Sequence, residues 1–163
     1  MKRLAILTAL AVAWPGSALA DSFKATLTSY QEVPSVSSLA EGTFEAKSAG
    51  DWLSVDYTLT FSGLQAAVQQ AHIHFAQPSV NGPIIIWICG TSGTPGPAGT
   101  PTCPQSGTVT GTFTTANVLA APSTQQLGAG EIGEMISAMK AGVAYVNVHT
   151  AVSPGGEIRG QIK

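Results

Sequence analysis

Hydrophobic and polar residues alternate along several short segments of the chain, which are separated by glycine and proline. The clearest is residues 52–61, where every second residue from Leu53 to Phe61 is apolar and the residues between are polar. A period of two is typical of a β-strand with one buried face. Alternating or continuously apolar segments predict seven further strands: Phe23–Ser29, Gly42–Ser48, Ala71–Phe75, Ile84–Cys89, Thr108–Thr114, Val143–Thr150 and Glu157–Ile162.

One segment, Gly130–Ala141, has a helical period instead. Its apolar residues recur three or four positions apart, Glu134 lies in the first turn, Lys140 lies in the last, and Gly142 follows as a C-cap. We interpret it as a helix that packs on the core, with a functional helix as the alternative. The turn signal Ser153–Gly156 predicts that the last two strands form a hairpin. The whole pattern predicts an all-β fold, a Greek-key-like β-sandwich or barrel with one short crossover helix.

Composition and charge exclude some classes of protein. The net charge is −2, with 7 basic and 9 acidic residues among 163. Nucleic-acid binding needs clustered basic residues, and intrinsic disorder needs low hydrophobicity with high net charge, so both are disfavoured. The length is that of one domain.

The N-terminus has the pattern of a secretory signal peptide. Lys2 and Arg3 precede an apolar run at residues 4–14, and Ala18–Ala20 forms a small-x-small cleavage site before Asp21. The run is shorter than the roughly 20 residues that span a bilayer, so a retained membrane anchor is the weaker alternative. The residue directly after the cleavage site is Asp21 and not a lipid-carrying cysteine. We predict a signal peptide at 1–20, a single domain at 21–163, and a periplasmic or secreted protein.

Cys89 and Cys103 are the two cysteines of the chain, and export favours a disulfide between them. The segment between them is rich in glycine and proline and has no helix or strand signal. A redox-active or metal-binding pair is the alternative, although the spacing is far from C-x-x-C.

The three histidines are the candidate functional residues. His72 and His74 are two residues apart on a predicted strand, so both side chains point to the same face. His149 ends another alternating strand, where Tyr145 and Asn147 share its face. If the two strands are neighbours, three imidazoles converge, and such a set suits zinc or copper at about 2.0–2.1 Å. The alternative is three polar residues on a solvated sheet face.

Further polar residues accompany the histidines. Glu157 and Arg159 share a face of the last strand, and the simpler interpretation is that they pair with each other or with neighbouring strands. The alternative is that Arg159 holds an anion beside the histidines while Glu157 orients an imidazole from outside the ligand set. Asn147 and Glu32 are further candidates for such a supporting role.

The chain resembles the chordin-domain (CHRD) family. The resemblance rests on blocks that run in order from Phe23 to Ile162: F-K-A-T-L, E-V-P, A-H-I-H, A-Y-V-N-V-H-T and P-G-G-E-I-R-G-Q. It departs in one place, because Ser35 stands where the family usually has a second proline after E-V-P. The resemblance implies an extracellular β-domain of poorly defined biochemistry, often exported on its own in bacteria. Its blocks include all three histidines, which favours a metal site.

A looser similarity is to copper–zinc superoxide dismutases. There, an H-x-H pair and a distant histidine bind copper, and an arginine near the C-terminus guides superoxide. His72, His74, His149 and Arg159 follow that order, but the chain has no further histidine for a bridging imidazole or a zinc loop. The likeness concerns the site and transfers no activity.

These observations favour an exported copper-binding domain, with zinc as the other metal and copper-only superoxide dismutation as the leading catalytic option. A zinc hydrolase with Glu157 as general base is a weaker hypothesis. The non-catalytic alternative is a metal-independent extracellular module that binds another protein. No membrane span after signal cleavage and no nucleic-acid partner are expected.

Overall fold

The computed structural model describes residues 19–163, and residues 1–18 of the predicted signal peptide lie outside the described residues. The elements in order are β1 (Ser22–Thr28), η1 (Ser29–Gln31), β2 (Glu41–Ser48), β3 (Ser54–Ser62), β4 (Val68–Phe75), β5 (Ile84–Gly90), β6 (Gly107–Thr114), η2 (Thr115–Asn117), α1 (Ile132–Lys140), β7 (Ala144–Thr150) and β8 (Ile158–Gln161). All eight predicted strands and the predicted helix are confirmed, with ends that differ by at most three residues.

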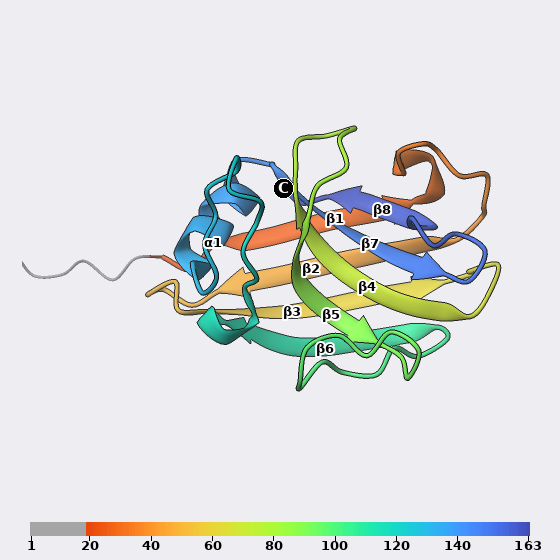
Figure 1. Cartoon of the computed structure of the whole chain (residues 1–163), viewed down its shortest axis with the longest axis horizontal. Coiled ribbons are helices and arrows are strands. Elements are labelled where there is room, and N and C mark those ends of the chain that lie inside the picture. The colour runs from red at the N-terminus through yellow and green to blue at the C-terminus, as the bar shows by residue number, and fades with distance from the viewer. Residues whose placement is uncertain (1–18) are drawn as a thin grey trace, which may run out of the picture.

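The eight strands form one antiparallel sheet in the order β5-β4-β7-β8-β1-β2-β3-β6. The sheet curls until its two edge strands, β5 and β6, approach each other, which makes it a nearly closed barrel (Figure 1). The Tyr57 hydroxyl on β3 crosses this seam and donates a hydrogen bond to the Ile88 carbonyl on β5, at 3.3 Å. The all-β, barrel-like prediction is therefore confirmed.

Helix α1 crosses between β6 and β7 and covers one end of the barrel (Figure 1). The residues that set its helical period, Ile132, Met135, Ile136 and Met139, are all buried in the core. Gly142 follows the helix with a φ of 69°, in the left-handed region that glycine adopts without strain. The interpretation as a core-packing helix is consistent with these contacts.

The start of β3 differs from the prediction. Leu53 was expected to share the buried face of the strand, but it is 61% exposed and precedes the first residue of β3, Ser54. Trp52 has a φ of 58°, so the chain is still in a turn at this point. The alternation of apolar and polar residues continues back through this turn. The predicted strand therefore began two residues before the observed one.

Strand β7 is the element that positions the functional residues. All seven of its residues are buried, although only one face of the strand lies against the barrel core. Ala144, Val146 and Val148 belong to the core, while the opposite, outer face is covered by three connecting segments at residues 29–40, 76–83 and 151–157. Polar residues on the outer face of β7 are thereby removed from solvent.

Candidate metal centre

The three histidines lie together on the outer face of β4 and β7. In the antiparallel register His72 is opposite Asn147, His74 is opposite Tyr145, and His149 is opposite Gln70. One ring nitrogen of each histidine lies within 4.8 Å of those of the other two. The prediction that the two histidine strands are neighbours and that their imidazoles converge is confirmed, and this cluster could hold a metal ion.

The histidines are not on a solvated face. Relative exposures are 0% for His72, 6% for His74 and 5% for His149. The covering segments supply hydrogen-bond partners, because His74 Nδ1 lies 2.9 Å from the Gly82 carbonyl and His149 Nδ1 lies 2.9 Å from the Pro154 carbonyl. Carbonyl oxygens only accept, so both Nδ1 atoms carry the proton and donate.

These two hydrogen bonds determine where the lone pairs of His74 and His149 lie. A neutral imidazole has one N–H and one bare nitrogen, so Nε2 of both residues is unprotonated and directed into the cluster. His72 has no carbonyl anchor of this kind. Its Nδ1 lies 3.1 Å from His149 Nε2, and its Nε2 is buried with no hydrogen-bond partner among residues 19–163.

The site keeps its imidazoles neutral. Burial, followed by the electrostatic effects of His149 and His74, lowers the pKa of His72 to about 2. Burial also lowers the pKa of His74 to about 4, against the opposing effect of its hydrogen bond to Gly82. The pKa of His149 is lowered by burial in the same way. Metal binding at neutral pH would therefore displace few protons from these rings.

Two aromatic side chains enclose the cluster. Trp87 on β5 contacts the His72 ring edge-on, with 4.3 Å between ring centroids. Tyr145 on β7 stacks on the His74 ring at 4.6 Å with an angle of 1° between the planes. Sequence reasoning missed Trp87, which lay in a continuously apolar segment with no pattern to distinguish it.

Arg159 lies beyond Tyr145, on the next strand. Its guanidinium carbon is 3.4 Å from the centroid of the Tyr145 ring. Because β7 separates β4 from β8, the Tyr145 ring lies between His74 and Arg159. The guanidinium donates to the Val80 carbonyl at 2.9 Å and to Asn81 Oδ1 at 3.3 Å. Arg159 thus fastens the 76–83 segment over the site, and it is 1% exposed.

Glu157 is fully buried and its carboxylate is occupied. Oε1 accepts hydrogen bonds from the Ser38 hydroxyl at 2.7 Å and the Gln65 amide at 2.9 Å, and Oε2 accepts one from the Thr150 hydroxyl at 2.8 Å. These hydrogen bonds connect the 29–40 segment, and the segment between β3 and β4, to the β7–β8 hairpin. In the described part of the chain, Glu157 hydrogen-bonds to none of the imidazoles and pairs with no basic residue.

Glu32 lies beside Asn147. Its carboxyl and the Asn147 amide nitrogen both press against Gly156, where a Cβ would overlap them. Gly156 has a φ of 125°, so both its conformation and the lack of a side chain are required there. Burial raises the pKa of Glu32 to about 7, against the lowering effects of the Arg159 charge and the Asn147 amide.

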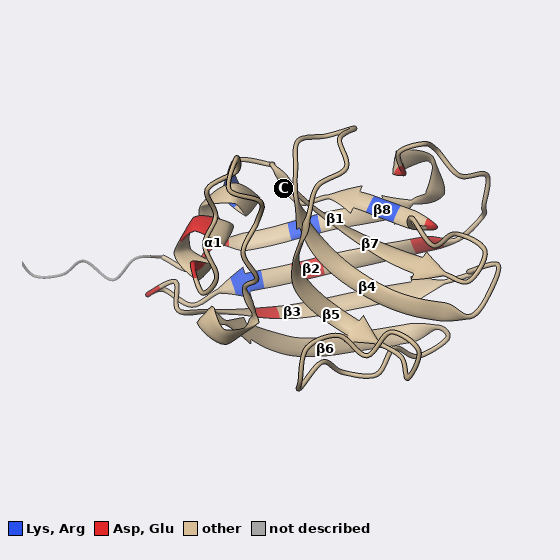
Figure 2. Ribbon diagram, viewed as in Figure 1, with Lys and Arg blue, Asp and Glu red and all other residues tan. Residues whose placement is uncertain are grey.

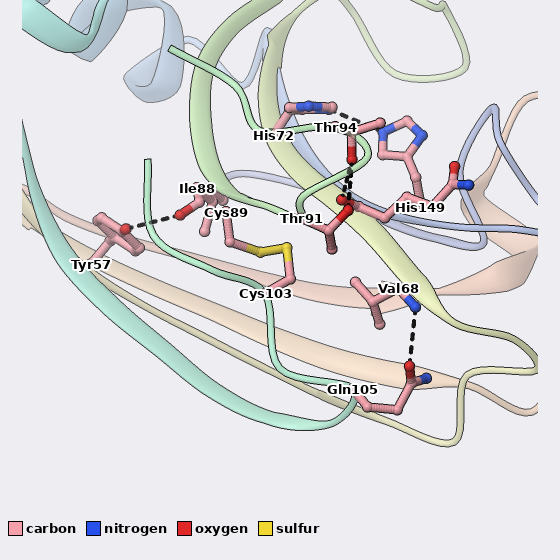
Figure 3. Close-up of a disulfide and its surroundings, with 11 residues drawn as sticks. Tyr57, Val68, His72, Ile88, Cys89, Thr91, Thr94, Cys103, Gln105 and His149 are labelled. Atoms are coloured by element: carbon pink, nitrogen blue, oxygen red, sulfur yellow. Dashed lines mark hydrogen bonds between the residues drawn. A yellow bond between two sulfur atoms is a disulfide. The ribbon is translucent and has the colours of Figure 1, made fainter. Parts of the chain in front are cut away.

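The predicted disulfide between Cys89 and Cys103 is confirmed. It joins the end of β5 to the segment before β6, and Figure 3 shows it near the cluster, where the His72 and His149 rings point toward each other. The enclosed segment packs against Trp87, because a Cβ on Gly96 would overlap the indole. The disulfide therefore supports the residue that contacts His72.

Charged residues are sparse elsewhere. Figure 2 shows Lys and Arg scattered over β1, β2, β8 and α1, with no basic cluster in the part of the chain that the structure describes. Two ion pairs are present there, Lys24 with Glu45 at 3.1 Å and Lys140 with Asp21 at 2.9 Å. Across residues 19–163, no helix is long and apolar enough to cross a membrane.

Fold and site together define a barrel-like β-domain with three histidines buried beneath its connecting segments. The chain belongs to the CHRD domain family, whose sequence pattern it matches over residues 23–162. No curated protein and no solved structure matches the chain.

Four of the five sequence blocks that carried the family resemblance converge in space. A-H-I-H is in β4, Y-V-N-V-H-T is in β7, and the G-G-E-I-R-G-Q block leads into β8 and supplies Gly156, Glu157 and Arg159. E-V-P contributes Glu32 from the covering segment. These four blocks thus supply residues that build and cover the histidine cluster.

Proposed function

We propose that this protein is an exported metal-binding protein and that His72, His74 and His149 bind one copper ion. The observation that carries the proposal is the direction of the lone pairs. Backbone carbonyls hold the Nδ1 protons of His74 and His149, so both Nε2 lone pairs point into the same buried space. With its proton on Nε2, His72 would add a third lone pair from Nδ1.

The donor set supports copper over other divalent metals. Imidazole nitrogens suit both copper and zinc, and copper binds more tightly in the divalent series. The aromatic rings of Trp87 and Tyr145 exclude water around the donors, and backbone carbonyls orient two of the imidazoles, as supporting residues do at metal sites. Export is supported by the leader pattern and by a disulfide, since disulfides persist in oxidising compartments.

The test is a copper titration of purified protein without a histidine tag. The chelator-treated protein should take up one Cu(II) per chain, with nitrogen hyperfine structure in the EPR spectrum. His74→Ala should abolish stoichiometric binding, because it removes a donor that the fold holds in place. The matched control is Gln161→Ala on β8, which removes an amide that donates to the Ala76 and Gly142 carbonyls.

Either of two results would reject the copper proposal. Full occupancy of His74→Ala would show that the histidines are not the ligands, and tighter zinc binding in direct competition would replace copper by zinc. If the wild-type protein takes up no metal and folds equally well in chelator, the metal-independent interaction module becomes the better description.

Superoxide dismutation is a second proposal, favoured by the position of Arg159. Bound copper supplies one-electron chemistry, and Arg159 and Glu32 line a cavity of about 400 Å³ at the outer surface. An anion in that cavity would meet the Arg159 charge one aromatic ring away from His74. Dismutation should be measured at matched copper occupancy with and without Arg159→Ala, and the absence of activity in fully loaded wild-type protein would reject it.

A further inference from the structure

The Asn147 side chain lies at the centre of the histidine cluster. Its Oδ1 is 3.0 Å from His74 Nε2 and 3.0 Å from His149 Nε2. The residue is 2% exposed and is opposite His72 in the strand register. The amide oxygen therefore approaches two of the three candidate ligand atoms at the same distance.

Neither of these two contacts contains a hydrogen in the neutral protein. His74 and His149 each donate their single N–H to a backbone carbonyl, so their Nε2 atoms have only lone pairs. An amide oxygen also has only lone pairs. Three electron-rich atoms thus meet at about 3 Å with no proton between them.

The other end of the amide shows why the oxygen takes this position. The Asn147 amide nitrogen and the Glu32 carboxyl lie side by side against Gly156. Glu32 Oε1 is buried and has no hydrogen-bond partner in the described chain. The reversed amide would direct its oxygen at this carboxyl and away from the imidazoles. A carboxyl oxygen beside the amide nitrogen instead favours the orientation with Oδ1 toward the histidines.

We propose that Asn147 Oδ1 is the fourth donor of the metal site and that Glu32 is the positioning residue that directs the amide oxygen toward the imidazoles. This inference rests on the proposed function, because it assigns one more ligand to the same ion. A cation in the cluster removes the conflict among the three lone-pair atoms, since each then faces positive charge. Asn147 moves from a supporting residue, as the sequence suggested, to a direct ligand.

The added donor changes the metal preference of the site. Three imidazole nitrogens and one amide oxygen form a neutral set without a soft sulfur ligand. Thiolate and thioether donors select Cu(I), whereas nitrogen and oxygen donors suit divalent ions. The site is therefore expected to hold Cu(II) more tightly than Cu(I).

The test compares five variants, one of them a control, with wild-type protein in a Cu(II) titration followed by EPR. Asn147→Ala should weaken Cu(II) binding by about 10–100-fold and shift g∥ while nitrogen hyperfine structure persists. Asn147→Asp restores an oxygen donor and should restore affinity. Glu32→Ala should reproduce part of the g∥ shift, and Glu32→Gln, which keeps an acceptor for the amide, should reverse it. Gln161→Ala serves as the control for loss of a half-buried amide.

A second measurement uses the wild-type chain alone and does not depend on any variant folding. On addition of Zn(II), the Asn147 side-chain carbonyl carbon should shift in the NMR spectrum because its oxygen becomes a ligand. The side-chain carbonyl carbon of Gln161 should not move.

The outcomes separate the two proposals. If wild-type protein binds no metal, the proposed function and this inference both fail. If wild-type protein binds Cu(II) but Asn147→Ala leaves the affinity and g∥ unchanged, or the Asn147 carbonyl carbon does not shift with Zn(II), the fourth donor is refuted and the three-histidine site remains.

Discussion

At the scale of single residues, the arrangement of the site depends on a position without a side chain. Gly156 has a φ of 125°, and a Cβ there would overlap the Glu32 carboxyl and the Asn147 amide nitrogen. Gly155, its neighbour in sequence, has space for a Cβ, with no atom of the described chain within 4 Å. Gly155 can therefore accommodate a side chain, whereas Gly156 cannot.

We predict that Gly156→Ala lowers the free energy of unfolding by about 1–3 kcal/mol, because it adds backbone strain and displaces Glu32 and Asn147. It should also weaken metal binding, since Asn147 contacts two of the imidazoles. Chemical denaturation and Cu(II) titration would measure the two effects. Gly155→Ala is the matched control and should change stability by less than about 0.5 kcal/mol. Equal effects of the two substitutions would contradict the prediction.

Glu32 and the histidines have opposite effects on stability as the pH changes. The pKa of Glu32 is raised from 4.5 to about 7, so its contribution is fully present below pH 4.5 and is lost as the pH rises through 7. The pKa of His74 is lowered from 6.5 to about 4, so its contribution is present above pH 6.5 and is lost as the pH falls toward 4. Between pH 4.5 and 6.5 the two therefore oppose each other.

We predict that the metal-free Glu32→Gln variant loses stability on acidification more steeply than wild-type protein. The substitution removes a group that gains protons on folding and leaves the histidine contribution unopposed. The difference accumulated between pH 6.5 and 4.5 should be on the order of 2–3 kcal/mol, measured by denaturation at each pH in chelator. Parallel pH profiles for the two proteins would show that Glu32 has an ordinary pKa in the folded state.

At the scale of elements, the strands and helix could be predicted because each has one consistent hydrophobic period. Leu59 and Ile136 are fully buried where a period of two and a helical period, respectively, place them. The same alternation assigned Asn147 and His149 to the outer face, which is correct. It could not show that this face is buried, because burial depends on the three connecting segments that fold over it.

The parts of the site that were not predicted are mostly contacts made by the backbone. The Gly82 and Pro154 carbonyls orient two imidazoles, and any residue type offers such a carbonyl, so the sequence carries no signal for them. The stacking of Tyr145 between His74 and Arg159 depends on the order β4-β7-β8, which local patterns do not encode. The shared face of His72 and His74 was predictable, because residues two positions apart on a strand point to the same side.

Removal of the disulfide that closes the 89–103 segment gives the clearest prediction at this scale. Cys89 and Cys103 are separated by 14 residues in the sequence, and the double substitution to serine should cost about 3 kcal/mol of unfolding free energy by the loss of a chain constraint. The segment packs on Trp87, which contacts His72, so tryptophan fluorescence and Cu(II) affinity should change as well. Unchanged stability in the double variant, compared with oxidised wild-type protein, would contradict this expectation.

At the scale of the whole molecule, the site joins parts of the chain that are distant in sequence. The histidines come from β4 and β7, Glu32 comes from the segment after β1, and Gly156 and Arg159 come from the hairpin that ends in β8. Glu157 links the Ser38 and Gln65 segments to the same hairpin. An unfolded chain cannot bring these groups together, so a metal ion that binds the cluster binds the folded state selectively.

We therefore predict that Cu(II) raises the melting temperature of the protein. At a free metal concentration 100 times the Kd, the added stability is about 2.7 kcal/mol, which corresponds to a shift of roughly 5–10 °C for a domain of this size. The shift should disappear in His74→Ala, persist in Gln161→Ala, and grow with the logarithm of the metal concentration. A destabilising effect of Cu(II) on wild-type protein would show that copper prefers the unfolded chain, and an equal shift in His74→Ala would place copper binding outside the histidine cluster.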